Sequence, residues 1–155
     1  MRTTRADGGE IPAYERAVAM LARREHSRAE IALRLRRDGY QDEEVEPALD
    51  ELESRGLQSD ERFCEAFVRA RVQRLQGPRK IEAELRERGI ASSLIAAALE
   101  GAGIDWEAQA SQALARRFDG PGQGPREYAR RQRFLAGRGF DGEQSRRAMA
   151  HAWED

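Results

Sequence analysis

Residues that favour β-strands are scarce in this sequence. Its 155 residues include two threonines, four valines and six isoleucines. Because β-branched residues favour strands, this scarcity argues against a β-sandwich or an α/β nucleotide-binding fold. The chain instead contains 26 arginines and 25 alanines, both strong helix formers. We therefore predict an almost wholly helical protein.

Disulfides, secretion signals and membrane spans are also missing from the sequence. The single cysteine, Cys64, cannot form an internal disulfide, which fits a reducing compartment. No uninterrupted apolar segment comes near the roughly 20 residues that a transmembrane helix needs. The first ten residues, MRTTRADGGE, contain no apolar core of a secretory signal. These absences predict a cytoplasmic protein that does not enter a membrane.

No residues stand in a pattern typical of an active site or a metal site. His26 and His151 are far apart in the sequence and have no cysteine cluster, so both are expected at the surface or at helix ends. Cys64 stands between Phe63 and Phe67, as expected of a buried structural thiol. The glycine-rich segment 120–124 lacks the Lys-Ser/Thr pair of a phosphate-binding loop. We predict that the protein is not an enzyme, with no catalytic residue, no metal ion and no cofactor.

Charge is balanced over the whole chain and segregated along it. The formal net charge is −1, so bulk charge does not mark a nucleic-acid-binding protein. Residues 41–61 hold nine acids against one arginine, and residues 62–80 then hold six bases against one acid. Residues 116–138 hold seven arginines against two acids. This alternation predicts surfaces of opposite sign.

The sequence repeats itself with a period of 50 residues. In each copy a helical leucine is followed four positions later by glycine and then by a large apolar residue. A glycine just past a helix end adopts the left-handed conformation of a C-terminal cap, and the apolar residue after it packs back on the last turn. The three copies are Leu35–Gly39–Tyr40, Leu85–Gly89–Ile90 and Leu135–Gly139–Phe140.

Another helix is expected ahead of each of these capped helices. Helical apolar spacing predicts first helices at Tyr14–Glu25, with Val18 facing inward, at Asp60–Leu75 and at Asp105–Phe118. Ser27 with Glu30 forms the pattern of a capping box, and Pro78 stands where a first helical turn tolerates proline. The middle helix of the third copy is expected to be about one turn longer, with Tyr128 near the start of its apolar face.

The period predicts an all-α protein of three tandem three-helix repeats. We place the repeats at 13–56, 58–102 and 104–155, after a disordered tail at 1–12. A unit this small buries little surface alone, so neighbouring repeats are expected to pack on each other. Such packing gives an elongated, curved, solenoid-like body.

Arginines gather in two segments that carry few acids. The sequence has no acidic residue between Arg69 and Lys80, so these side chains have no nearby acidic partner along the chain. Arginine forks suit phosphate and carboxylate partners, and a solvated face paired with glutamates is the alternative. The candidate contact residues are Arg69, Arg71, Arg74, Arg79 and Lys80 in the second repeat, with Arg126, Arg130 and Arg131 in the third.

The second repeat carries the most specific pattern. Leu57-Gln-Ser-Asp60-Glu-Arg-Phe63 is followed by Phe67-Val-Arg69 and then by Gly77-Pro78-x-Lys80-Ile81, ahead of the capped Leu85–Gly89–Ile90. Together with Ser27, Glu30, Leu35 and Gly39 of the first repeat, this pattern resembles RecX, the bacterial family of regulatory proteins that modulate the RecA recombinase. The resemblance covers about residues 14–155, and the third repeat is the most divergent.

The resemblance implies a fold of three tandem three-helix repeats, which agrees with the period. It also implies a function in DNA repair, recombination and the SOS response. RecX-like proteins bind RecA, lie in the groove of its filament on DNA and bridge neighbouring protomers. They hinder filament growth, ATP hydrolysis, strand exchange and cleavage of the SOS repressor, without a cofactor. A monomer is expected, and weak direct DNA binding is compatible with this role.

Two alternatives remain open from the residues alone. The first is a DNA-binding protein, because three-helix units resemble helix-turn-helix modules. It predicts tight DNA binding without RecA and a steep salt dependence. The second is an α-solenoid scaffold for another protein partner, which predicts no effect on RecA.

Overall fold

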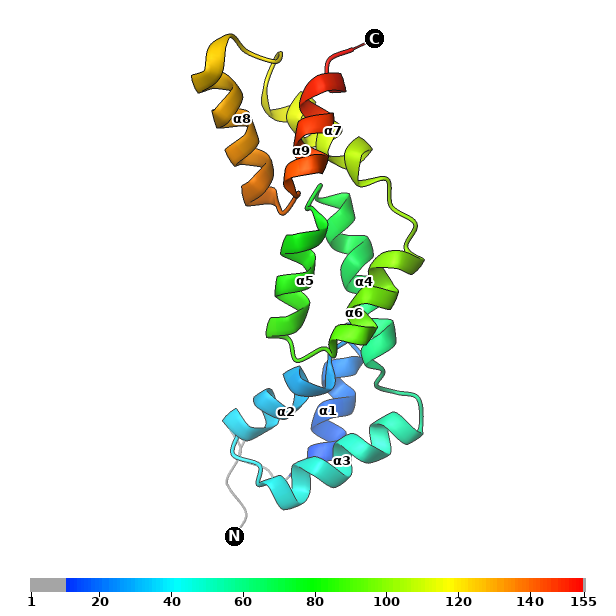
Figure 1. The fold of residues 1–155 in the computed structure, drawn as a ribbon. Helices are drawn as coiled ribbons and strands as arrows, with labels where there is room; N and C mark the ends of the chain where they lie inside the picture. The colour runs from blue at the N-terminus through cyan, green and yellow to red at the C-terminus, as the bar shows by residue number, and fades with distance from the viewer. Residues whose placement is uncertain (1–10, 155) are drawn as a thin grey trace. The chain divides into compact units, whose positions relative to one another are not determined.

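The computed structural model describes residues 11–154, so most of the tail expected at 1–12 lies outside the described residues. Within residues 11–154 the secondary structure consists of nine α-helices and contains no strand. The helices are α1 (Ala13–Leu21), α2 (Arg28–Arg37), α3 (Asp42–Ser54), α4 (Asp60–Gln73), α5 (Pro78–Glu87), α6 (Ser92–Gly101), α7 (Trp106–Arg117), α8 (Gly124–Arg138) and α9 (Gly142–His151), as Figure 1 shows. The predicted all-α class is confirmed.

Glycine ends the middle helix of each three-helix set. Gly39, Gly89 and Gly139 have φ angles of 95°, 78° and 101°, which residues with a Cβ rarely adopt. The amide of Tyr40 donates to the carbonyl of Leu35 at 3.0 Å, and that of Phe140 to the carbonyl of Leu135 at 3.1 Å. These bonds reach back over the last helical turn, as in a Schellman cap. The apolar residue after each glycine is buried, with Tyr40, Ile90 and Phe140 at most 5% exposed.

Helix starts follow local capping rules. Ser27 and Glu30 form the predicted capping box at α2, because each side chain accepts from the other residue's backbone amide. Asp141 and Gln144 form a second capping box at α9, which was not expected from the sequence. Pro78 is the first residue of α5, where its missing N–H costs no helical hydrogen bond.

The chain divides into two compact units. Of the described residues, 11–66 and 86–94 belong to unit 1, and 67–85 and 95–154 belong to unit 2. In unit 1, α1 packs against both α2 and α3, and α2 packs against α3 (Figure 1). Their shared core contains Ala13, Ala17, Ile31, Ala32, Leu35, Tyr40, Val45, Ala48, Leu49 and Leu52.

In unit 2, α9 packs against α7 and α8 (Figure 1). The core comprises Leu75, Ala110, Ala113, Leu114, Phe118, Leu135, Phe140, Ala148 and Met149. Leu75 is the unexpected member, because it follows α4 in the sequence yet is buried among residues of the last three helices. It has a φ of 59°, the one positive φ of a non-glycine residue in the described chain.

Some details differ from the sequence expectations. Helix α1 ends at Leu21 and not at Glu25, because the chain turns before the Ser27 cap of α2. Helix α4 ends at Gln73, so Leu75 does not belong to its apolar face. Val18 and Tyr128 were expected to face inward, but they are 36% and 39% exposed. The expected longer middle helix of the third repeat is confirmed, since α8 has 15 residues where α2 and α5 have 10.

In the part of the chain that the structure describes, no helix is both long and apolar enough to cross a membrane. Among the same residues, no group of three or more His, Cys, Asp or Glu side chains could hold a metal ion.

Candidate functional site

Four of the candidate basic side chains form what we call the basic surface of unit 2: Arg69, Arg74, Arg79 and Lys80. Arg69, Arg74 and Arg79 are exposed, and Lys80 is half-buried. None of these four side chains forms an ion pair with another described residue. Their charges are therefore available to an anionic partner.

Arg71 differs from the basic surface because its side chain turns inward. Its Nη2 lies 3.5 Å from the Oε2 of Glu84, and its side chain is only 16% exposed. Its Cζ lies 4.3 Å from the centroid of the Phe67 ring, within cation–π distance. The sequence has no acid between Arg69 and Lys80, but α5 supplies one from farther along the chain. Arg71 therefore helps to join α4 to α5 and is poorly placed for direct contact with a partner.

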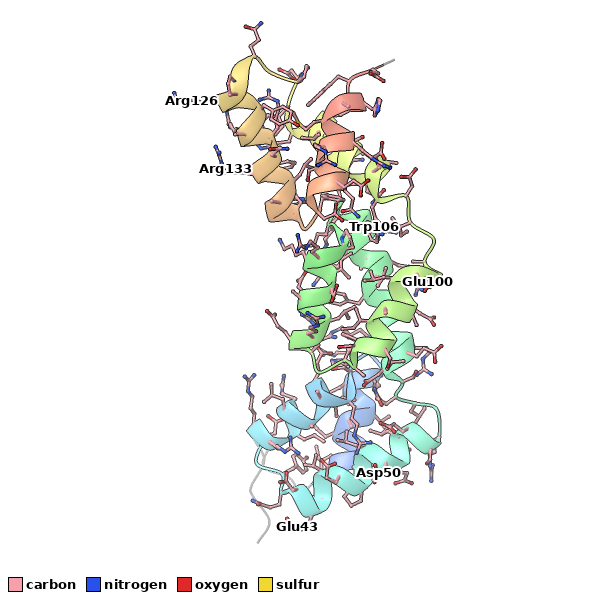
Figure 2. All side chains as sticks on the ribbon, in the orientation of Figure 1. Glu43, Asp50, Glu100, Trp106, Arg126 and Arg133 are labelled. Carbon is pink, nitrogen blue, oxygen red and sulfur yellow. The ribbon has the colours of Figure 1, made fainter. Side chains whose placement is uncertain are left out.

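The candidates on α8 also divide into exposed and buried side chains. Arg126 and Arg130 are exposed, and Figure 2 shows Arg126 and Arg133 projecting outward from α8. Arg131 is only 7% exposed. Its Nε donates to the carbonyl of Gly120 at 2.9 Å and its Nη1 to the carbonyl of Glu127 at 3.1 Å. We therefore correct the expectation for Arg131, because its buried guanidinium holds the loop before α8 and is poorly placed for direct contact with a partner.

A close backbone contact fixes the start of α5 in unit 2. The amide of Gly77 donates to the carbonyl of Arg138 at 2.6 Å, and that of Arg79 to the carbonyl of Gly139 at 3.0 Å. A Cβ at Gly77 would collide with the backbone of Gly139, and a Cβ at Gly139 would lie 2.5 Å from the Cβ of Lys80. Two glycines therefore let the end of α8 reach the backbone that carries Arg79 and Lys80. We call this contact the glycine joint.

Unit 1 contains a corresponding contact at positions 50 residues earlier. The hydroxyl of Ser27 donates to the carbonyl of Arg88 at 2.8 Å. A Cβ at Gly89 would lie 2.5 Å from the Cβ of Ala29. Ser27, Arg88 and Gly89 are the counterparts of Gly77, Arg138 and Gly139. The period predicted the glycines, but nothing in the sequence predicted what they contact.

Asp60 and Phe63 also serve the local packing of unit 1. The carboxylate of Asp60 accepts from the amide of Arg28 at 2.8 Å and from the Nε2 of Gln58 at 2.9 Å. Phe63 is 4% exposed. The neighbouring Cys64 is fully buried, and burial raises the pKa of its thiol to about 11, so the thiol is protonated and unreactive at neutral pH.

The acidic segment of α3 is partly neutralised inside unit 1. Arg28 pairs with Glu46, Asp50 and Glu53 at 2.8–3.2 Å, and Arg36 pairs with Asp42 and Glu46 at 2.8 Å and 3.1 Å. The hydrogen bond to Glu53 is the largest cause of a raised pKa for Arg28. Figure 2 shows Glu43 and Asp50 on the outer side of this helix.

Comparison with known proteins identifies the three sets of three helices as known domains. Sequence models of the first, second and third three-helix domains of RecX match residues 13–52, 59–99 and 105–149. The regulatory protein RecX of Chromohalobacter salexigens is 53% identical over 139 residues, which cover 90% of this chain and 91% of that protein. The chain belongs to the RecX family.

Other RecX proteins agree with this assignment. Regulatory protein RecX of Halorhodospira halophila is 47% identical over 140 residues, covering 90% of this chain and 87% of that protein. A crystal structure of regulatory protein RecX matches with a TM-score of 0.75 at 26% identity, covering 86% of this chain and 68% of that one. The crystal structure of RecX from Lactobacillus salivarius shares the fold, with a TM-score of 0.77 at 19% identity, over 90% of this chain and 94% of that one. The predicted RecX family and its three tandem three-helix domains are confirmed.

Proposed function

We propose that this RecX protein binds the RecA filament on DNA and restrains it. In this proposal the bound protein lies in the groove of the filament and bridges neighbouring RecA protomers. It thereby lowers filament extension, ATP hydrolysis, strand exchange and the cleavage of the SOS repressor. The protein acts as a cytoplasmic monomer, without catalysis or a cofactor, through the repeats 13–56, 58–102 and 104–155.

The observation that carries this proposal is the match of the whole chain to RecX regulators, in all three domains. The charge distribution supports it. Basic residues outnumber acidic ones in unit 2, while acidic residues outnumber basic ones in unit 1. A partner that offers phosphate and acidic protein surface would attract unit 2 through its unpaired arginines. Several weak contacts along one filament would add to a tight interaction.

The direct test is RecA ATP hydrolysis on single-stranded DNA, with this protein titrated far below one molecule per RecA. We expect strong inhibition at these low ratios, because a bound regulator that blocks filament growth affects many RecA subunits. Inhibition that begins only when the protein coats the DNA would instead indicate competition for DNA. No effect at any ratio would refute the proposal and leave a scaffold for another partner.

Charge reversal of the basic surface tests which residues make the contact. We expect the triple variant Arg69→Glu, Arg74→Glu and Arg79→Glu to need at least tenfold more protein for half-inhibition. The matched control is the triple variant of Arg37, Arg116 and Arg146 to Glu. These three arginines are also exposed, form no ion pair with a described residue and give the same change in net charge. Equal losses in both variants would contradict a specific role for the basic surface.

Direct DNA binding is the second candidate function. The unpaired arginines of the basic surface favour it, because such groups also suit the phosphates of a nucleic acid. It predicts tight binding to DNA in the absence of RecA. It also predicts that the basic-surface variant loses DNA binding while its inhibition of RecA is unchanged.

A further inference from the structure

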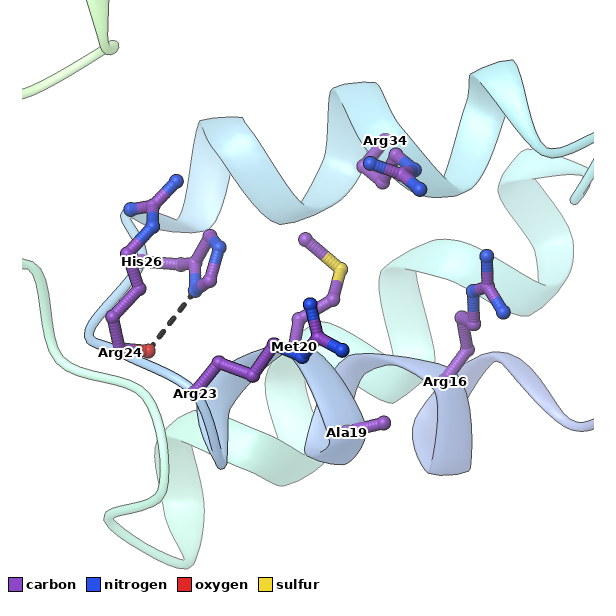
Figure 3. Close-up of a pocket in the computed structure, with 7 residues that line it drawn as sticks. All are labelled: Arg16, Ala19, Met20, Arg23, Arg24, His26 and Arg34. Carbon is purple, nitrogen blue, oxygen red and sulfur yellow. Dashed lines mark hydrogen bonds between the residues drawn. The ribbon is translucent and has the colours of Figure 1, made fainter.

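Unit 1 contains a cleft that the proposed function does not use. It has a volume of about 580 Å³ and lies between α1 and α2 (Figure 3). Four arginines line it: Arg16 from α1, Arg23 and Arg24 from the turn that follows α1, and Arg34 from α2. The cleft shares no residue with the basic surface of unit 2.

Carboxylates hold some of these arginines in place without neutralising all of them. Asp38 pairs with both Arg16, at 3.2 Å, and Arg34, at 3.4 Å. Arg24 pairs with Glu30 at 3.5 Å. Arg23 is exposed and forms no ion pair with any described residue. Four guanidinium groups therefore face two carboxylates, which leaves an excess of positive charge at the cleft.

The remaining lining of the cleft is largely apolar or uncharged. Ala19 and Met20 of α1 contribute to it, and Figure 3 shows Met20 directed into the space between α1 and α2. His26 closes one end, and its Nδ1 lies 3.1 Å from the carbonyl oxygen of Arg24. Burial, with the charge of Arg24, lowers the pKa of His26, so its ring is neutral at neutral pH. Methionine adapts its flexible side chain to varied apolar partners.

We propose that this cleft binds an acidic segment of a protein partner, in which apolar side chains alternate with carboxylates. Guanidinium groups can recognise carboxylates by paired hydrogen bonds. Asp38 and Glu30 already form ion pairs with Arg16 and Arg24 at the cleft. Met20 and Ala19 would receive the apolar side chain beside the carboxylate. A nucleic acid fits this position less well than a short acidic segment, because its phosphate backbone would continue beyond the cleft over a unit in which acidic residues outnumber basic ones.

The test measures binding of the full chain to a fluorescein-labelled synthetic peptide of alternating glutamate and leucine, by fluorescence anisotropy. We expect Arg23→Glu to weaken binding by at least tenfold, because it places a negative charge at the unpaired position. Met20→Gln is expected to weaken it several-fold, because the apolar contact is lost. The matched control is Arg37→Glu, which makes the same charge change on α2 outside the cleft. Circular dichroism checks that every variant remains helical.

Each outcome of this test decides the proposal. Binding by the wild type, loss in Arg23→Glu and no loss in Arg37→Glu would support it. No binding by the wild type, or equal losses in the two variants, would overturn it. Displacement of the peptide by a single-stranded oligonucleotide that itself depends on Arg23 would assign the cleft to nucleic acid and would also overturn it. Because the peptide assay contains no RecA, its result does not depend on the result of the RecA experiment.

Discussion

At the residue scale, Arg131 occupies the position that Ile31 and Ile81 hold in the first two repeats. Both isoleucines are fully buried, and Arg131 is almost as deeply buried. Its Cζ lies 4.4 Å from the centroid of the Phe118 ring, and its N–H groups donate to two backbone carbonyls. A charged residue can replace an apolar one here because its stem packs on an aromatic ring and its head group has acceptors.

We expect Arg131→Ala to lower the free energy of unfolding by about 1–3 kcal/mol, because the carbonyl of Gly120 loses its donor and Phe118 loses packing. Arg133→Ala is the control, since Arg133 is exposed on the same helix. Its effect should stay within about 0.5 kcal/mol. Urea unfolding followed by circular dichroism measures both, and equal effects would contradict the structural role of Arg131.

His26, expected at the surface or at a helix end, lies just before the cap of α2 and is 7% exposed. Burial and the charge of Arg24 lower its pKa below the ordinary 6.5, while Glu30 and Glu25 oppose this shift. The folded protein therefore binds the His26 proton more weakly than the unfolded chain does. The stability from neutral His26 is complete above pH 6.5 and is lost as the pH falls through the lower folded pKa.

Replacing His26 by the residue found 50 positions later, Gln76, tests this linkage. We expect wild-type stability to fall more steeply than that of His26→Gln when the pH is lowered from about 7.5 to 5. Urea unfolding of both proteins at matched ionic strength gives the difference, and the carboxylates common to both cancel. Parallel pH profiles would show that His26 does not contribute.

At the scale of secondary-structure elements, the glycine joint decides how closely α8 approaches the start of α5. Gly77 and Gly139 meet backbone to backbone, and Arg138 adds a bond from its Nε to the carbonyl of Leu75 at 3.3 Å. Leu75 in turn lies in the core of the last three helices. The turn between α4 and α5 is therefore part of the packing of the third repeat.

A pair of glycine-to-alanine substitutions tests the joint. Gly77→Ala should destabilise the protein by more than about 2 kcal/mol, because the new Cβ would collide with backbone atoms that cannot rotate away. Gly137→Ala in α8 should stabilise it by about 0.5–1 kcal/mol, because a Cβ there meets no atom within 4 Å and alanine favours the helix. Thermal and urea unfolding measure both changes. A neutral Gly77→Ala would contradict the close approach.

At the scale of the whole molecule, a net charge of −1 conceals two units of opposite sign. The acids of α3 are partly satisfied by Arg28 and Arg36, whereas the basic surface of unit 2 has no ion-pair partner among the described residues. The average charge therefore understates how strongly one part of the protein attracts anions.

This segregation predicts the salt dependence of any direct DNA binding. We expect weak binding of the wild type to single-stranded DNA, with affinity that falls as salt rises. The variant in which Arg69, Arg74 and Arg79 are glutamate should lower the slope of log K against log salt by roughly two, since each phosphate contact on a single strand contributes about 0.7. Anisotropy titrations over a range of salt concentrations measure the slope. An unchanged slope would place the DNA contacts on other residues.

The sequence by itself determined the helical class, the three repeats and the ends of the capped helices. These features follow from interactions within a few residues, such as the Ser27–Glu30 capping box and the positive φ of Gly39, Gly89 and Gly139, which composition and spacing reveal. The overall curvature of the repeats stays a prediction.

Only the tertiary structure decided which arginines face outward. Arg71 and Arg69 look alike in the sequence, but Glu84 from the next helix turns Arg71 inward. Arg131 is buried against Phe118 and the carbonyl of Gly120, which come from the end of α7 and the loop that follows it. The cleft of unit 1 brings together arginines from α1, from the turn after it and from α2. These contacts depend on how the helices and loops pack together, which local sequence rules do not predict.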